Sequence, residues 1–253
     1  MKIVVIGGTG LIGRQLVSDL VDRGHEVLAA SPGTGVNSVT GEGLAPSLAG
    51  ANVVIDVSNA PSLADDEVVT FFQTSATNVA LAARKAGVAH AVLLSIVGTD
   101  RLQGSSYFRG KQAQEAAFAH SGVPFTIVRA TQFFEFLGTI ADGCTRDGVA
   151  HLPTFALQPI AASDVAATLA DVAQSEAVNG IVEIAGPERA PLVEFVGTWL
   201  GHRDDSRAIV PDAETGYFGV PADDRTLVPG AGARLLPTRF EAWLTAQPAR
   251  QQA

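Results

Sequence analysis

The sequence of 253 residues predicts an α/β protein with a doubly wound parallel sheet and a small C-terminal annex. Strand and helix patterns alternate along the first half of the chain, as in parallel sheets that helices cover on both faces. The predicted strands are nearly continuous apolar runs, which is typical of strands buried on both sides. A glycine-rich turn also joins the first predicted strand to the first predicted helix.

The order of the elements follows from the spacing of apolar residues and from the glycines and prolines between them. Strands are predicted at residues 2–6, 25–30, 52–57, 89–97, 124–128 and 181–185. Helices are predicted at residues 11–23, 44–48, 65–86, 107–120, 163–175, 192–200 and 238–244. The pattern weakens beyond residue 138, and residues 201–237 show little periodicity.

The charge balance disfavours nucleic acid as a partner. The chain has 17 Lys and Arg against 26 Asp and Glu, a net charge of −9, whereas phosphate neutralisation needs clustered basic side chains. No apolar run is long enough to span a bilayer or to form the core of a signal peptide. We therefore expect a cytoplasmic protein that binds neither nucleic acid nor a membrane.

Cysteine and histidine usage predicts no disulfide and no metal site. The one cysteine, Cys144, excludes an intramolecular disulfide and a cysteine-based metal cluster. The five histidines are scattered along the chain without the spacing of metal ligands. A Gly-x-Ser-x-Gly sequence, which would hold the nucleophile of one class of hydrolases, does not occur.

The glycine-rich turn has the sequence GGTGLIG, follows the first strand directly and opens the first helix. Glycines in this position allow a tight turn, let the backbone approach a pyrophosphate, and let the helix pack closely on the strand. The motif therefore predicts a Rossmann-type dinucleotide site. The expected cofactor contacts in this segment are Gly7, Gly8, Thr9, Gly10, Leu11, Ile12, Gly13 and Arg14.

The residues after the second strand favour NADP(H) over NAD(H). A site for NAD usually has an acidic residue at the end of that strand, but this chain has Ser31 there and no acid in residues 28–40. Ser31 and Thr34 would donate hydrogen bonds to a 2′-phosphate, and Arg14 would supply a cation. Residues 31–50 contain no Lys or Arg, so Arg14 is the one nearby cation that the sequence offers.

A tyrosine and a lysine, Tyr107 and Lys111, are four residues apart on a predicted helix, so their side chains share one face. A nearby ammonium would lower the pKa of the tyrosine from its usual value near 10 and make it a general acid or base. Ser95 lies at the carboxyl end of a predicted parallel strand, where open α/β sheets bind ligands. Its hydroxyl would hold a substrate oxygen beside Tyr107.

With the glycine turn, Ser95 and the Tyr–Lys pair, the chain resembles the short-chain dehydrogenase/reductase superfamily. It most resembles the atypical and extended branch that includes the NmrA-like NAD(P)-binding proteins. The sequences SGVPFTIVR at residues 121–129 and AGPE at residues 185–188 also resemble this branch. The resemblance extends over residues 1–200 and fades beyond them.

The resemblance implies a role for each residue of the site. Tyr107 would exchange a proton with the substrate, Lys111 would contact the nicotinamide ribose and lower the tyrosine pKa, and Ser95 would polarise the substrate carbonyl. Hydride would pass between the nicotinamide and the carbonyl carbon. Further cofactor contacts are implied for residues that follow two of the strands: Ser58, Asn59, Gln132 and Phe133.

Two positions depart from the family pattern. Ala130 follows Arg129 where the family often has proline, and Phe72 occupies the position at which many relatives have a helix asparagine. Asn78 is the only asparagine in the predicted helix 65–86. We therefore do not expect a proton relay through that helix position.

These features predict an NAD(P)-dependent short-chain dehydrogenase/reductase that transfers hydride to or from a small carbonyl or alcohol substrate. Two alternatives stay open: an NmrA-like regulator that senses NADP(H) without turnover, and an epimerase or isomerase that retains NAD. Residues 1–137 are expected to form the cofactor-binding core. Residues 138–253 are expected to pack on it and to supply strands, helices and substrate loops. The expected partner is a small molecule, and the chain would be a monomer or a homodimer.

Overall fold

The structure of the protein, a computed structural model, describes residues 1–62 and 64–247 and divides them into two compact units. The first unit comprises Met1–Arg129 and Val165–Val182. The second comprises Ala130–Asp164 and the described residues from Glu183 onward. This division differs from a single boundary at residue 137, because residues 165–182 return to the first unit after the chain has entered the second.

A parallel sheet of seven strands confirms the expected α/β fold. Its strand order is β12-β9-β5-β4-β3-β1-β2. The strands are β1 (Lys2–Ile6), β2 (Glu26–Ala30), β3 (Val53–Asp56), β4 (His90–Ile96), β5 (Phe125–Ala130), β9 (Gly180–Ala185) and β12 (Arg234–Leu235). β2 pairs with one edge of β1 and β3 with the other, both in parallel. This switch point places the carboxyl ends of β1 and β3 side by side, where doubly wound sheets bind ligands.

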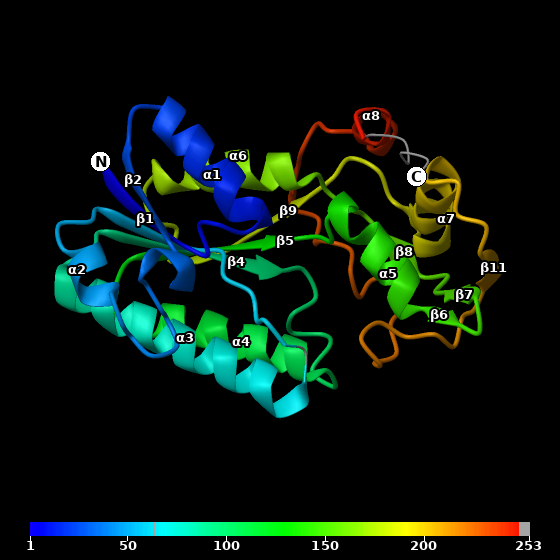
Figure 1. Ribbon diagram of the computed structural model, residues 1–253, viewed down its shortest axis with the longest axis horizontal. Coiled ribbons are helices and arrows are strands. Elements are labelled where there is room, and N and C mark those ends of the chain that lie inside the picture. Colours follow the sequence, from blue (N-terminus) through cyan, green and yellow to red (C-terminus); the bar gives the residue numbers. More distant parts are fainter. Residues whose placement is uncertain (63, 248–253) are drawn as a thin grey trace. The chain divides into compact units, whose positions relative to one another are not determined.

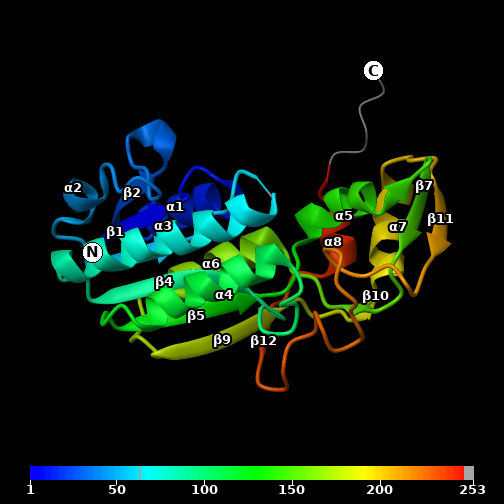
Figure 2. The ribbon, with the colours of Figure 1, turned by 90° about the horizontal axis from the view of Figure 1, so that it is seen from below.

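Helices cover both faces of the sheet in the first unit (Figures 1 and 2). On one face lie α1 (Leu11–Asp22) and α6 (Ala162–Ala173), and on the other lie α3 (Asp65–Ala86) and α4 (Ser106–Ala119). A short helical turn η1 (Pro32–Thr34) and the helix α2 (Leu44–Leu48) follow β2. The chain is therefore wound to both sides of the sheet, as the alternating pattern predicts.

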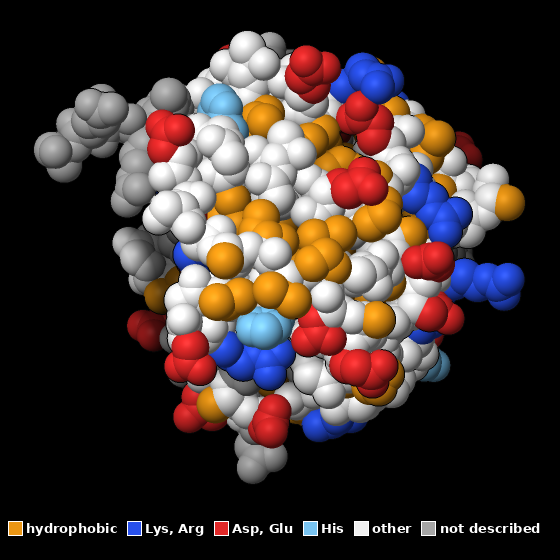
Figure 3. Space-filling view, turned by 90° about the vertical axis from the view of Figure 1, so that its right-hand side faces the viewer, with side chains coloured by type: hydrophobic (Ala, Val, Ile, Leu, Met, Phe, Trp, Pro, Cys, Tyr) orange, Lys and Arg blue, Asp and Glu red, His pale blue; other side chains and the backbone are white. Residues whose placement is uncertain are grey.

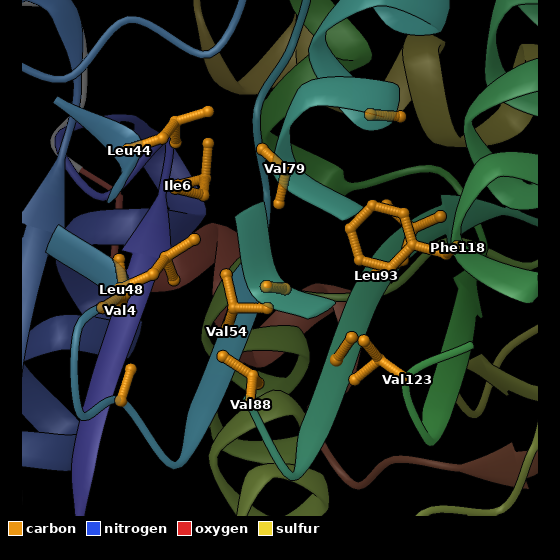
Figure 4. Close-up of a cluster of buried hydrophobic side chains, with 14 of the residues drawn as sticks. Val4, Ile6, Leu44, Leu48, Val54, Val79, Val88, Leu93, Phe118 and Val123 are labelled. Carbon is orange, nitrogen blue, oxygen red and sulfur yellow. The ribbon is translucent and has the colours of Figure 1, made fainter. Parts of the chain in front are cut away.

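One hydrophobic cluster of the first unit lies between the sheet and α2, α3 and α4 (Figure 4). Val and Ile side chains of β1 and β3 point toward apolar residues of these helices. The labelled members of this cluster are Val4, Ile6, Leu44, Leu48, Val54, Val79, Val88, Leu93, Phe118 and Val123. Because a fully buried aliphatic or aromatic side chain contributes about 1.5–3 kcal/mol, this cluster is a main source of stability for the unit.

The helices α3 and α4 pack closely because Gly110 lies where they meet. A Cβ atom at Gly110 would be 2.8 Å from Cδ2 of Phe72 and 3.2 Å from the carbonyl oxygen of Val68. Phe72 is fully buried, so its ring has little room to move away. A side chain at position 110 would therefore push the two helices apart.

The second unit contains short helices and two small sheets, one with the order β11-β7-β6 and one that pairs β10 with β8. The helices are η2 (Phe134–Phe136), α5 (Leu137–Gly143), α7 (Leu192–His202) and α8 (Phe240–Thr245). The strands are β6 (Thr145–Arg146), β7 (Val149–Leu152), β8 (Ala156–Leu157), β10 (Ala190–Pro191) and β11 (Ala208–Pro211). Aromatic rings of Phe134, Phe195, Phe240 and Trp243 pack together in this unit, with neighbouring centroids 5.2–6.0 Å apart.

Basic and acidic side chains are interspersed on the face that Figure 3 shows. Hydrophobic side chains gather near its centre, and Lys and Arg side chains lie among Asp and Glu side chains around them.

Within residues 1–62 and 64–247, none of the helices has the length and apolar character needed to cross a membrane.

The close approach at Gly110 predicts that Gly110→Ala lowers the free energy of unfolding by about 1–3 kcal/mol, the usual effect of overpacking a core. The control is Gly201→Ala, because Gly201 lies in α7 with open space around its Cβ position. There a helical alanine is expected to be neutral or slightly stabilising. Chemical denaturation measures both variants, and equal stability of the two would contradict the packing argument.

Candidate active site

The glycine turn joins β1 to α1 and packs against β2 and against the residues that follow β3. Gly7 has a φ of +79°, and a Cβ there would lie 2.8 Å from the backbone nitrogen of Ser58. A Cβ at Gly8 would lie 2.7 Å from Cα of Ala29, and one at Gly13 only 2.2 Å from the carbonyl oxygen of Gly7. Each of these glycines therefore allows a backbone contact that no other residue would permit.

The turn has the features of an anion site. α1 begins after Gly10 with no side chain capping it and no acidic residue in its first turn, so its first N–H groups are open to an anion. The Oγ of Ser58 is buried and has no hydrogen-bond partner among the described residues. A buried hydroxyl without a partner is rare in proteins and fits a bound ligand group at this position. A dinucleotide pyrophosphate suits both features.

The end of β2 lies beside this turn, since Gly7 donates to the carbonyl oxygen of Ala30 (2.9 Å). Ser31 is nearly buried, and its backbone N–H donates to Oγ1 of Thr34 (2.9 Å). The Thr34 hydroxyl in turn donates to backbone carbonyls of this turn, including that of Ala29 (2.9 Å). Arg14 is exposed, and its Nη1 donates to the carbonyl oxygen of Thr9 (3.0 Å), so a guanidinium lies on the glycine turn.

The helix α4 presents a polar stripe to the sheet. Tyr107, Lys111 and Glu115 follow one another at intervals of one turn, and Gln114 lies beside them. Lys111, Gln114 and Glu115 are all buried, and Tyr107 is half-buried. Tyr107 and Lys111 therefore lie on one face of α4, as the sequence predicts.

The hydroxyl of Tyr107 donates to Oδ1 of Asn59 (3.1 Å), which lies three residues beyond β3. Burial raises the pKa of Tyr107 to about 12. The expectation that Lys111 lowers this pKa is therefore wrong for the ligand-free chain. The reason is that the Lys111 ammonium is directed at other groups, so the desolvation of the tyrosine is not offset.

Hydrogen-bond acceptors and one aromatic ring surround the ammonium group of Lys111. Its Nζ donates to the carbonyl oxygen of Leu94 (2.9 Å) and to Oε1 of Gln114, and it lies 4.9 Å from the centre of the Phe72 ring. Burial lowers the pKa of Lys111 to about 8, although the negative charges of Asp56 and Glu115 act in the opposite direction.

Ser95 belongs to a second buried cluster. Its Oγ donates to Oε1 of Glu115 (2.5 Å), and Arg129 donates to both carboxylate oxygens of Glu115 (2.9 and 2.8 Å). Arg129 also forms an ion pair with Asp100 (3.1 Å). Ser95 is only 1 % exposed. To polarise a substrate carbonyl, its hydroxyl would have to leave Glu115, and its expected catalytic role stays a prediction.

The helix asparagine of the family has no equivalent in α3. Phe72, which occupies its position, is fully buried and packs edge-on against Tyr107 with centroids 5.5 Å apart. Asn78 instead donates to the carbonyl oxygens of Ser38 (2.9 Å) and Val39 (2.8 Å) and so fastens the loop after β2. The amide that contacts the tyrosine in this chain is Asn59.

Gln132 and Phe133 belong to the second unit, so their expected contact with the nicotinamide stays a prediction. Gln132 is nearly buried, and neither its Oε1 nor its Nε2 has a partner among the described residues. Its backbone oxygen accepts from Ile160 (2.9 Å). The ring of Phe133 stacks on that of Phe136 with centroids 5.4 Å apart, and Phe136 is exposed.

The sequence pattern alone does not assign Gln114, Glu115 or Asp56 to this site. Two signals would have found them. Asp56 and Arg129 are charged residues at or near the ends of largely apolar strands, and a buried charge needs a partner. Glu115 lies one further turn along the helix from Lys111, on the face already assigned to the site.

A family model described as NAD(P)H-binding matches residues 7–176. The chain belongs to this NAD(P)H-binding family of NmrA-like, atypical short-chain dehydrogenases/reductases. The matched residues include the glycine turn, Ser95, Tyr107 and Lys111. The chain is therefore a member of an NAD(P)-binding oxidoreductase family.

Two curated relatives are reductases. The chain is 31% identical over 280 residues to (4-alkanoyl-5-oxo-2,5-dihydrofuran-3-yl)methyl phosphate reductase of Streptomyces griseus, covering 98% of this chain and 94% of that one. It is also 31% identical over 225 residues to divinyl chlorophyllide a 8-vinyl-reductase of Cucumis sativus. That match covers 75% of this chain and 54% of the plant protein. The chain thus spans about half the length of the chlorophyllide reductase.

Solved structures show the same fold at low identity. The dTDP-4-dehydrorhamnose reductase of Bacillus anthracis in complex with NADP has a TM-score of 0.68 at 14% identity, with 87% of each chain covered. The Bordetella bronchiseptica enzyme WbmG in complex with NAD has a TM-score of 0.68 at 19% identity, covering 88% of this chain and 84% of that one.

The buried cluster predicts that Ser95→Ala lowers the free energy of unfolding by about 1–3 kcal/mol, because Glu115 loses a buried hydrogen-bond donor. Ser18→Ala, at an exposed position of α1, is the control and should be nearly neutral. Chemical denaturation of both variants tests this. A Ser95→Ala variant as stable as the parent would mean that the hydroxyl does not hold Glu115.

Proposed function

We propose that the protein is an NAD(P)H-dependent reductase in which Tyr107 donates a proton to a small substrate. The observation that supports this best is the position of its hydroxyl. It contacts Asn59 (3.1 Å) just beyond β3, and Ser58, the residue before Asn59, packs against Gly7 of the glycine turn. The proton donor and the dinucleotide turn thus meet at the switch point of one sheet.

The protonation state of Tyr107 is consistent with reduction. A phenol with a pKa of about 12 is protonated at neutral pH, so in the resting protein it is a proton donor rather than a base. Transfer of this proton leaves a phenolate. A proton from solvent then restores the phenol.

The bound cofactor supplies the hydride. The chain would hold its pyrophosphate with the backbone of the glycine turn and the amino end of α1, and would offer it the hydroxyl of Ser58. Lys111 would contact the nicotinamide ribose with the N–H that its protein partners do not use. Gln132 and Phe133 would border the nicotinamide.

The substrate class follows from the two relatives. The name of the Streptomyces enzyme describes a 5-oxo-2,5-dihydrofuran, whose ring has a carbon–carbon double bond next to a carbonyl, and the plant enzyme is named for a vinyl group. We propose a small carbonyl compound or one with a double bond conjugated to a carbonyl. Hydride adds to the electrophilic carbon, and the proton of Tyr107 goes to the carbonyl oxygen or to the enolate that hydride addition forms.

Ser95 has a positioning role in this proposal. Its hydroxyl is already donated to Glu115 (2.5 Å), and Glu115 is the residue one turn beyond Lys111. Ser95 therefore acts on the site through the helix α4 rather than by contact with the substrate. The stability variant Ser95→Ala should accordingly keep most of its turnover.

The proposed role of Tyr107 predicts that Tyr107→Phe lowers kcat by about 10²–10⁴-fold, the usual contribution of a positioned acid, while NADPH affinity is retained. The other tyrosine, Tyr217, lies in the second unit and gives a matched control, Tyr217→Phe, that should keep its turnover. A screen of small carbonyl and enone compounds with NADPH supplies the assay. Full activity of Tyr107→Phe would refute Tyr107 as the proton donor.

The preference for NADP(H) depends on Arg14. We expect Arg14→Ala to weaken NADPH binding by about tenfold or more, as for the loss of a hydrogen bond to a charged group, and to leave NADH binding unchanged. Arg84→Ala, at an exposed position of α3, serves as the control. Fluorescence titration with both cofactors measures the effect. An equal loss for NADH and NADPH would contradict recognition of the 2′-phosphate by this side chain.

A further inference from the structure

A buried carboxylate and a buried amide lie behind Lys111. Asp56, at the end of β3, and Gln114, on α4, are both completely buried. Nε2 of Gln114 donates to Oδ2 of Asp56 (3.0 Å), and Oε1 of the same amide accepts from Nζ of Lys111. The other carboxylate oxygen of Asp56 accepts from the backbone N–H of Ser58 (2.9 Å). A continuous chain of hydrogen bonds therefore joins the ammonium of Lys111 to the backbone beside the glycine turn.

We propose that Asp56 and Gln114 are positioning residues that act as a clamp on Lys111 and aim its remaining N–H at the bound dinucleotide. This proposal rests on the proposed function and adds two residues to its site. We define the clamp as Asp56, Gln114 and the carbonyl group of Leu94. It holds two of the three ammonium hydrogens, one on Gln114 and one on Leu94 (2.9 Å). The third has no acceptor among the described residues.

Only an amide at position 114 fits between these two partners. Lys111 requires an acceptor, whereas the carboxylate of Asp56 requires a donor, and the carboxamide offers one of each. A leucine would give neither bond. A glutamate would accept from Lys111 but would place a second carboxylate against Asp56. The clamp therefore depends on the orientation of one amide, with its oxygen toward the lysine.

The clamp also places a carboxylate, that of Asp56, near the buried ammonium of Lys111. The negative groups that act on Lys111 are Asp56 from β3 and Glu115 from α4 itself. From α3, the Phe72 ring faces Nζ at 4.9 Å from its centre, and Tyr107 lies one turn away as a neutral phenol. Arg129 is paired with Glu115 (2.8 Å), so Asp56 is the carboxylate left to balance Lys111. Burial raises the pKa of Asp56 above its usual value, and the hydrogen bonds from Ser58 and Gln114 and the charge of Lys111 offset only part of this rise.

The small number of lysines makes a direct test possible without a substrate. The chain has three lysines, Lys2, Lys85 and Lys111, so lysine labelled with ¹³C at Cε gives three NMR signals. The variants Lys2→Arg and Lys85→Arg assign two of them. A pH titration of the ligand-free protein then follows Lys111, whose pKa is expected at about 8 in the parent.

The clamp variants are Asp56→Asn, which has the same shape without the charge, and Gln114→Leu, which removes both bonds. Each is expected to lower the pKa of Lys111 by about one unit, because a buried ammonium loses a stabilising partner. Gln114→Glu is expected to raise it, because the acceptor becomes an anion. Gln112→Leu, at an exposed position of the same helix, is expected to leave it unchanged.

A second set of measurements links the clamp to function. With NADPH and a substrate, Gln114→Leu should lower kcat and move the alkaline limb of its pH profile to lower pH, while the substrate KM changes little. A merely structural role would lower stability without moving the profile. Gln112→Leu should match the parent in kcat, in the alkaline limb of the pH profile and in the substrate KM.

The outcomes separate the clamp from the proposed function. If the pKa of Lys111 moves as described but the parent neither binds NADPH nor turns over, the clamp stands and the proposed function fails. If the pKa of Lys111 is the same in the parent, Asp56→Asn and Gln114→Leu, the clamp is refuted whatever the turnover. Because Asp56→Asn preserves the side-chain shape, it provides the test if Gln114→Leu does not fold.

Discussion

The position of α4 on the sheet depends on the pairing of buried charges between them. Two guanidinium nitrogens of Arg129, in β5, donate hydrogen bonds to the carboxylate of Glu115, in α4 (2.9 and 2.8 Å). Lys111 is linked through Gln114 to Asp56 of β3. Removal of one partner from such a buried pair typically costs about 3–5 kcal/mol. A sliding of α4 along the sheet by one turn would unpair both, so the register of this helix is fixed, and with it the position of Tyr107.

The glycine turn also bears on how an acidic chain could bind an anionic cofactor. A chain with a net charge of −9 has to attract an anionic dinucleotide. In the proposed site, its glycine turn would do so with backbone N–H groups and the amino end of α1, which need no lysine or arginine. Close contacts make this turn possible, since a Cβ at Gly13 would lie 2.2 Å from the carbonyl oxygen of Gly7. Backbone geometry therefore replaces side-chain charge.

The sequence predicts the elements of the first unit well, because long apolar runs and helical spacing are local properties. The predicted helix 65–86 matches α3, and the strand predicted at 2–6 matches β1. Six short strands, β6, β7, β8, β10, β11 and β12, were not expected, and each has two to four residues. Runs of that length contain too few residues to show a period of two.

The site could be predicted only in part, for a physical reason. The spacing of Tyr107 and Lys111 shows that they share a helix face, and this needs no knowledge of the sheet. Which groups Lys111 meets depends on how α4 lies against β3 and β4, and that follows from packing between residues 17 to 58 positions apart. Ser95 illustrates the limit: its place at the end of a strand was predicted, but its bond to Glu115 was not.

The most direct test of the account follows the hydride itself. The protein is incubated with NADPH that carries deuterium at both C4 positions and with small carbonyl and enone compounds, and mass spectrometry analyses the products. The account predicts one deuterium on the carbon that is reduced, with the accompanying proton derived from solvent. Tight binding of NADPH without transfer of deuterium to any of these compounds would contradict a reductase and would favour a protein that senses the cofactor.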